Sequence, residues 1–156
     1  MRQSLIAVTP EETEALGARL ARALPAAHSA ALQVRLHGDL GAGKTTLARG
    51  FLAALGHAGA VRSPTYTLVE TYVFGALTVV HADLYRLQDP DEVEGLGLRD
   101  LAAAEHVWLI EWPQRAGPWL PAADLEVTLA AQPAFHSILL ESASATGAQW
   151  LAQVLS

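Results

Sequence analysis

The chain has 156 residues, of which 51% are hydrophobic, so it is long enough and apolar enough to fold around a core as one domain, residues 1–156. Its formal net charge of −6 argues against a domain that binds nucleic acid by itself, because such domains normally carry a basic patch. The sequence shows no cysteine, no N-terminal export signal and no apolar run of membrane-spanning length, so a cytoplasmic protein without disulfides is expected.

The first predicted element is a helix that begins at Thr9, whose side chain caps the first turn while Glu12 completes a capping box. Leucines at every fourth position then give this helix one buried stripe as far as Pro25. A linker over residues 26–31 leads to an alternating run over 32–36, which predicts a strand.

The predicted strand runs into a glycine-rich segment, Gly38–Thr45, that fits the phosphate-binding pattern G-x-x-x-x-G-K-[ST]. A helical pattern over 46–55 follows, which gives the order of strand, loop and helix that phosphate binding requires. The alternative interpretation is an ordinary glycine-rich turn before a helix. If the pattern is a phosphate-binding loop, the nucleotide contacts come from Asp39, Leu40, Gly41, Ala42, Gly43, Lys44, Thr45 and Thr46.

Two side chains of this loop have predicted roles of their own. Lys44 is expected to reach the β- and γ-phosphates, and the hydroxyl of Thr45 is expected to bind Mg²⁺. Lys44 is the one lysine among ten basic residues, which favours a position where a compact ammonium is needed rather than a planar guanidinium.

The rest of the chain alternates between strand-like and helix-like runs. Two β-rich runs over 68–74 and 77–81, joined through Gly75-Ala76, predict an antiparallel hairpin. The predicted fold class is α/β: a single P-loop NTPase domain with a mixed, mostly parallel sheet flanked by helices. Further predicted elements are a helix start at Asp89, a short helix over 99–105, strands over 106–110, 125–129 and 136–141, and a closing helix over 146–155.

Two carboxylates, Asp83 and Glu111, each end an apolar strand-like run, as the Mg²⁺-binding acid of a P-loop NTPase must. The sequence leaves open which of them binds the metal and which positions the attacking water. His81 could pair with Asp83 on a metal, but a hydrogen-bonded structural histidine is favoured. Arg86 could be an arginine finger, although a salt bridge with nearby acids is favoured.

Two residues near these acids are candidates for a switch or a partner contact. Thr65 lies in a loop where many NTPases keep a threonine that senses the γ-phosphate, and a strand-start threonine is the alternative. Trp112 is expected to be a packed or partner-facing aromatic rather than a base-stacking one.

Taken together, these motifs make the chain resemble the bacterial TsaE (formerly YjeE) family of ATPases in tRNA threonylcarbamoyladenosine biosynthesis. The resemblance covers nearly the whole chain, and any one block after the phosphate loop would be a weak match without the others. The matching blocks are Gly38–Thr46, Ser63–Glu70, His81–Leu87 and Glu111–Gln114, in that order.

The resemblance implies a small P-loop α/β domain that binds ATP with Mg²⁺, hydrolyses it slowly alone and works with the partner pair TsaB and TsaD, which would hold the tRNA. It implies that Thr45 and Glu111 are metal ligands, that Asp83 is a second functional acid, that Thr65 is a switch threonine and that Trp112 is functionally important. It points to Pro10 and Phe135 for contacts with the nucleotide base. A small-molecule kinase and a nucleotide-dependent adaptor that needs no hydrolysis remain the two alternatives.

Overall fold

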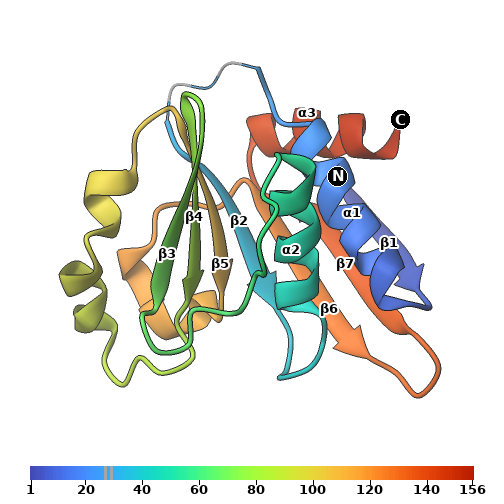
Figure 1. Ribbon diagram of the computed structural model, residues 1–156, viewed down its shortest axis with the longest axis horizontal. Helices are drawn as coiled ribbons and strands as arrows, with labels where there is room; N and C mark the ends of the chain where they lie inside the picture. The colour runs from blue at the N-terminus through green and yellow to red at the C-terminus, as the bar shows by residue number, and fades with distance from the viewer. Residues whose placement is uncertain (27, 29) are drawn as a thin grey trace.

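The computed structural model describes residues 1–26, 28 and 30–156, and the side chain of Arg99 is also outside the description. Its centre is a seven-stranded mixed sheet in the order β1-β7-β6-β2-β5-β4-β3 (Figure 1). The predicted linker over 26–31 falls partly on the two residues outside the description. The strands are β1 (Arg2–Ala7), β2 (Leu32–His37), β3 (Val69–Phe74), β4 (Leu77–Asp83), β5 (His106–Glu111), β6 (Leu125–Ala131) and β7 (His136–Ser142).

The sheet has a parallel centre and antiparallel edges. β6, β2, β5 and β4 are neighbours and run parallel. β3 joins one edge as the predicted hairpin partner of β4, and β7 and β1 extend the other edge antiparallel. The predicted mixed, mostly parallel α/β sheet is therefore confirmed, and its parallel strands present their carboxyl ends along one edge, where α/β proteins bind ligands.

Three α-helices lie against one face of the sheet: α1 (Pro10–Arg22), α2 (Lys44–Ala54) and α3 (Ala145–Leu155). Thr9 caps α1 as predicted, since its hydroxyl accepts a hydrogen bond from the backbone of Glu12 at 3.3 Å. The carboxylate of Glu12 returns to the amide of Val8, one residue before the expected capping-box partner. No helix in the described parts of the chain is long and apolar enough to cross a membrane.

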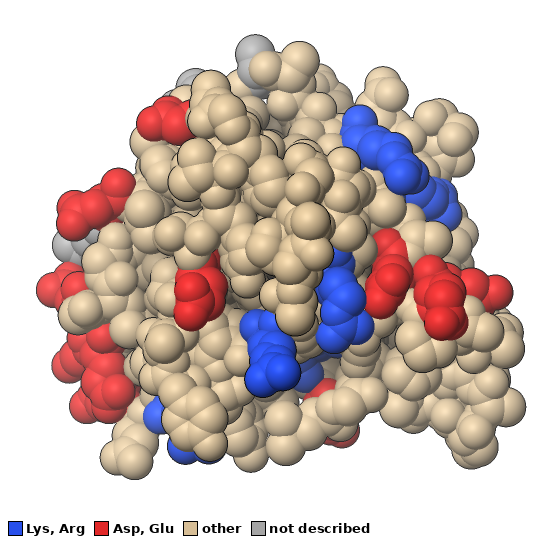
Figure 2. Space-filling view, viewed as in Figure 1, with Lys and Arg blue, Asp and Glu red and all other residues tan. Residues whose placement is uncertain are grey.

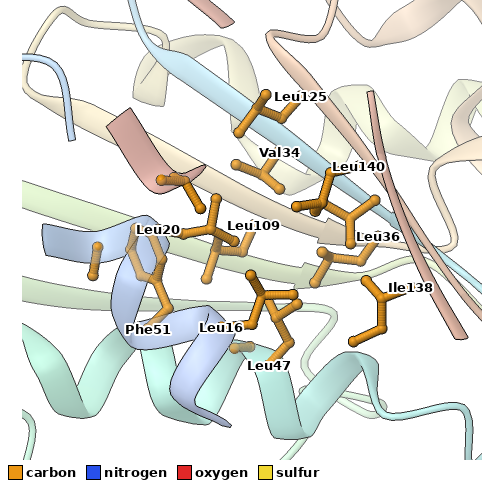
Figure 3. Packing of buried hydrophobic residues seen from close by; sticks show 14 of the residues in the cluster. Leu16, Leu20, Val34, Leu36, Leu47, Phe51, Leu109, Leu125, Ile138 and Leu140 are labelled. Atoms are coloured by element: carbon orange, nitrogen blue, oxygen red, sulfur yellow. The ribbon is translucent and has the colours of Figure 1, made fainter. Parts of the chain in front are cut away.

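The helices pack on the sheet through one large apolar cluster, which Figure 3 shows from close by. α1 and α2 approach so closely that a Cβ atom on Gly50 would lie 2.0 Å from the carbonyl oxygen of Glu14. This close contact fixes α2, and with it the loop that precedes α2. The labelled members of the cluster are Leu16, Leu20, Val34, Leu36, Leu47, Phe51, Leu109, Leu125, Ile138 and Leu140.

The opposite face is covered by three short 3₁₀ helices, η1 (Pro90–Leu96), η2 (Leu98–Leu101) and η3 (Pro113–Trp119). The helix start at Asp89 is confirmed, with both halves of a capping box to Glu92. The short helix predicted over 99–105 is wrong, because regular structure ends at Leu101. β1 is an element that the sequence patterns did not predict.

Candidate functional site

A cleft of about 390 Å³ opens at the carboxyl ends of β2, β4 and β5, at the lower edge of the sheet in Figure 1. Its walls come from the glycine loop, the start of α1, the loop after α2 and the start of β7. Most of the residues predicted for nucleotide, metal or switch contacts line it together. These are Pro10, Leu40, Gly41, Gly43, Lys44, Thr45, Thr46, Thr65, Asp83, Glu111 and Trp112.

The glycine loop curls because its three glycines, Gly38, Gly41 and Gly43, adopt positive φ angles that other residues avoid. Gly38 has φ +143°, and a Cβ atom there would lie 2.3 Å from the carbonyl oxygen of Leu129. Gly43 has φ +107° and is the N-cap of α2, where no side chain caps the first turn. Uncapped backbone amides at a helix N-terminus favour an anion, so the loop is suited to phosphate.

Lys44 lies at the base of the cleft and is only 5% exposed. Its ammonium donates to the carbonyl oxygens of Gly38 and Asp39, the latter at 2.9 Å. Burial lowers the pKa of Lys44, and the carboxylates of Glu111, Asp83 and Asp39 oppose that shift. The ammonium is thus held inside the loop by two carbonyl oxygens that a phosphate group could replace.

The side chains of Thr45 and Glu111 contact each other in the cleft. The Thr45 hydroxyl lies 3.2 Å from both carboxylate oxygens of Glu111, which is itself 2% exposed. Two hard oxygen donors side by side fit Mg²⁺, which takes one or two protein ligands and completes its shell with phosphate and water. The described residues contain no group of three or more His, Cys, Asp or Glu side chains that could hold a metal ion.

Asp83 is the direct neighbour of Glu111 in the register between β4 and β5. Its two carboxylate oxygens are both engaged, one by the hydroxyl of Ser63 and the other by the amide of Tyr85 at 3.0 Å. The Ser63 hydroxyl also lies 3.4 Å from Glu111, so one serine links the two acids. The hydroxyl of Thr65 turns back to the carbonyl oxygen of Ser63 at 3.4 Å, on the same cleft-lining loop.

Trp112 closes the side of the cleft next to Lys44. Its ring centroid lies 4.6 Å from the Lys44 ammonium and 4.8 Å from the ring of Tyr85, so it is packed between protein groups. The backbone of Trp112 is left-handed, with φ 58° and ψ 48°, which is uncommon for a large side chain. Arg86 stands over the ring of Tyr66 at 4.6 Å instead of forming the predicted salt bridge.

Some predicted contacts are not on the cleft wall. Asp39 and Ala42 belong to the loop but turn their carbonyl oxygens to Lys44 and His136, respectively. Phe135 is absent from the lining of the cleft as described, whereas its neighbour His136 is part of it. The contact of Phe135 with a nucleotide base therefore stays a prediction.

Among the cleft residues that the sequence patterns did not predict as site residues are Ser63 and His136. The imidazole of His136 bonds the carbonyl oxygen of Ala42 at 2.8 Å and so ties β7 to the glycine loop. The signals were weak: a hydroxyl two residues before Thr65, and a histidine at the first position of a strand.

Known proteins are similar to this chain over most of its length. The family model described as threonylcarbamoyl adenosine biosynthesis protein TsaE matches residues 7–137. A tRNA threonylcarbamoyladenosine biosynthesis protein TsaE of Haemophilus influenzae is 46% identical over 130 residues, which cover 81% of this chain and 82% of that protein. The protein of the same name from Bacillus subtilis is 39% identical over 122 residues, covering 78% and 73% of the two chains.

A solved structure is similar over almost the entire chain. The crystal structure of Bacillus subtilis YdiB superimposes with a TM-score of 0.75 and 27% sequence identity. The similarity covers 99% of this chain and 95% of that one, so the two proteins share the same overall fold.

Proposed function

The chain belongs to the TsaE family of threonylcarbamoyladenosine biosynthesis proteins, and we propose that residues 1–156 form one Mg²⁺-dependent ATPase domain acting in this tRNA modification. Its partners are the proteins TsaB and TsaD, and its place of action is the cytoplasm. tRNA binding is left to the partners, in keeping with the net charge of −6. On the face shown in Figure 2, acidic side chains gather at the left, where η1 and η2 lie in Figure 1, and again at the right, with basic side chains between them.

One observation carries this proposal: the Lys44 ammonium, the Thr45 hydroxyl and the Glu111 carboxylate meet in the same cleft, at the N-terminus of α2. A phosphate-binding lysine, a hydroxyl ligand and a strand-end acid are the parts that ATP hydrolysis needs. They come from β2–α2 and β5, which the parallel sheet holds next to each other.

The proposed mechanism is largely positional and electrostatic. The loop amides and Lys44 bind the phosphate oxygens and neutralise charge as the γ-phosphate is attacked by water. Thr45 and Glu111 would hold Mg²⁺, which when bound supplies charge neutralisation at the β- and γ-phosphates. Asp83, which accepts a hydrogen bond from Ser63 and neighbours Glu111 in the sheet, would be the second acid, and either carboxylate could orient the attacking water.

The loop that bears Thr65 is the proposed switch. Thr65 lines the cleft on the same loop as Ser63, whose hydroxyl contacts both Asp83 and Glu111. A contact of Thr65 with the γ-phosphate would therefore involve the segment that also holds the two acids. Loss of the γ-phosphate would release the loop and change the surface around Trp112 that faces a partner.

Steady-state ATP hydrolysis tests the proposal, measured with the purified chain alone and with TsaB, TsaD and tRNA. We expect weak hydrolysis alone and strong stimulation by the partners, both lost in Lys44→Ala. A Glu111→Gln variant that binds ATP but supports full tRNA modification would instead favour an adaptor that needs no hydrolysis. Transfer of labelled phosphate to a metabolite rather than to water would favour a small-molecule kinase.

A further inference from the structure

His81 is the most deeply buried polar side chain near the cleft, and the proposed mechanism gives it no role. It lies on β4, two residues before Asp83, and its exposed fraction is 0%. Alternate residues of a strand share a face, so its ring points to the same side of the sheet as Asp83. From there its Nε2 atom reaches the Oε2 atom of Glu111, on the neighbouring strand β5, at 2.6 Å.

The two nitrogens of the ring have different surroundings. Nε2 contacts the carboxylate of Glu111, whereas the other ring nitrogen, Nδ1, is buried and finds no hydrogen-bond partner among the described residues. An ionised carboxylate can only accept, so Nε2 is the donor in this contact. The ring is thus hydrogen-bonded to a protein carboxylate, in agreement with the hydrogen-bonded role favoured from the sequence.

The partners of Glu111 are divided unequally between its two oxygens. Oε2 is contacted by His81, Thr45 and Ser63, whereas Oε1 is contacted by Thr45 alone. Thr45 and Ser63 belong to cleft-lining segments, and Thr45 would turn its oxygen to a metal. His81 approaches from inside the sheet, where no ligand can displace it.

We propose that His81 is a positioning residue that holds Oε2 of Glu111 and thereby aims Oε1 into the cleft for the metal or its water. The inference rests on the proposed function, because it concerns the same acid. Partners that orient a ligand in this way typically contribute about 10-fold to 100-fold in metal affinity or activity.

Two amide variants separate positioning from packing. The side-chain nitrogen of Gln in His81→Gln reaches about as far as Nε2 of histidine, whereas His81→Asn carries the same amide on a shorter stem that cannot reach Glu111. The probe is Mn²⁺ in place of Mg²⁺, titrated into the protein–ADP complex and followed by electron paramagnetic resonance. ADP affinity without metal, and thermal unfolding, are measured beside it.

We expect His81→Asn to weaken Mn²⁺ binding by about 10-fold to 100-fold and His81→Gln by much less, with metal-free ADP affinity nearly unchanged in both. Equal Mn²⁺ affinity in His81→Asn and the parent protein would overturn the inference, as would equal losses in both variants. If His81→Asn does not fold, ¹⁵N NMR of the unsubstituted protein decides. A ring protonated at Nε2, with a signal that shifts in Glu111→Ala, supports the inference, and a ring protonated at Nδ1 overturns it.

The two hypotheses fail in different ways. A chain whose Mn²⁺·ADP affinity falls in His81→Asn as expected, but which hydrolyses no ATP with its partners, would refute the ATPase and leave the positioning role intact. A chain that hydrolyses ATP normally with His81→Asn would refute the positioning role alone. Absence of any Mn²⁺·ADP binding by the parent protein would refute both.

Discussion

The two faces of the sheet are built in different ways. On one face, three α-helices bury long side chains such as Leu20, Phe51 and Trp150 in a single large cluster. On the other, three short 3₁₀ helices cover a smaller cluster and leave a groove of about 350 Å³ beside Trp108 and Trp119. One face is closely fixed by its helices, and the other is covered by elements too short to be stable by themselves.

The proposed chemistry belongs to the closely fixed face. On β4, His81 and Asp83 lie on the same face as Val79, which belongs to the large cluster. On β5, Glu111 likewise shares its face with Leu109. The alternate rows, which face the 3₁₀ helices, stay apolar through Ala82 and Ile110. The cleft is therefore an extension of the rigid core. The side chains of β4 and β5 that face the α-helices are apolar along most of each strand and become polar at its carboxyl end.

The largest expected loss of stability comes from a glycine substitution on the face that the α-helices cover. Gly50→Ala is expected to destabilise the protein by about 3 kcal/mol or more, because the new Cβ would lie 2.0 Å from the carbonyl oxygen of Glu14 and force α1 away from α2. The intrinsic preference of a helix for Ala over Gly, about 1 kcal/mol, is too small to offset this. Urea unfolding followed by circular dichroism measures the loss.

Gly95→Ala, in η1 on the opposite face, is the matched control. A Cβ atom there meets nothing within 4 Å, so the free energy of unfolding should change by no more than about 0.5 kcal/mol. Similar losses in the two variants would show that the faces do not differ in rigidity as the structure indicates.

A smaller effect is expected from one tryptophan on each face. Trp150→Phe removes a buried hydrogen bond of 2.9 Å to the carbonyl oxygen of Leu20, which should cost about 1–3 kcal/mol because that oxygen is left buried without this donor. Trp119→Phe removes an exposed bond of 3.1 Å to Asp91, and water can replace the donor, so a loss below about 1 kcal/mol is expected. A greater loss in Trp119→Phe would contradict the comparison. Urea unfolding by circular dichroism again serves for both.

The features that could be predicted from the sequence are those carried by local patterns. The phosphate-binding loop has its glycines, lysine and threonine within one continuous segment, and the acids Asp83 and Glu111 mark the ends of apolar runs. The cap at Thr9 and the hairpin through Gly75 are equally local, since turn and capping chemistry depends on neighbouring residues.

What could not be predicted depends on residues that are distant in sequence. β1 is an exposed edge strand that pairs with β7 near the end of the chain, and its own pattern is weak. The bond between His81 and Glu111 spans 30 residues, and that between His136 and Ala42 spans 94. The region over 90–101 has helix-like capping but two glycines, and it forms two short 3₁₀ helices, the first of which ends at Gly97 in a left-handed conformation.

The smallest expected effect is on ADP affinity, and it tests the cleft itself. It compares alanine substitutions of two histidines at opposite ends of the sheet. His136 lies on the face of the large cluster and bonds the glycine loop at Ala42, so His136→Ala should loosen that loop. Loss of one neutral hydrogen bond is worth about 0.5–1.5 kcal/mol, which predicts an ADP dissociation constant raised by a factor of roughly 2 to 13. His106, at the amino end of β5, is half-buried and far along the strand from Glu111. His106→Ala should therefore leave ADP affinity unchanged, and isothermal titration calorimetry measures the affinity of both variants. An equal loss of affinity in both would mean that ADP binding depends on the general stability of the protein and not on the hydrogen bond between β7 and the glycine loop.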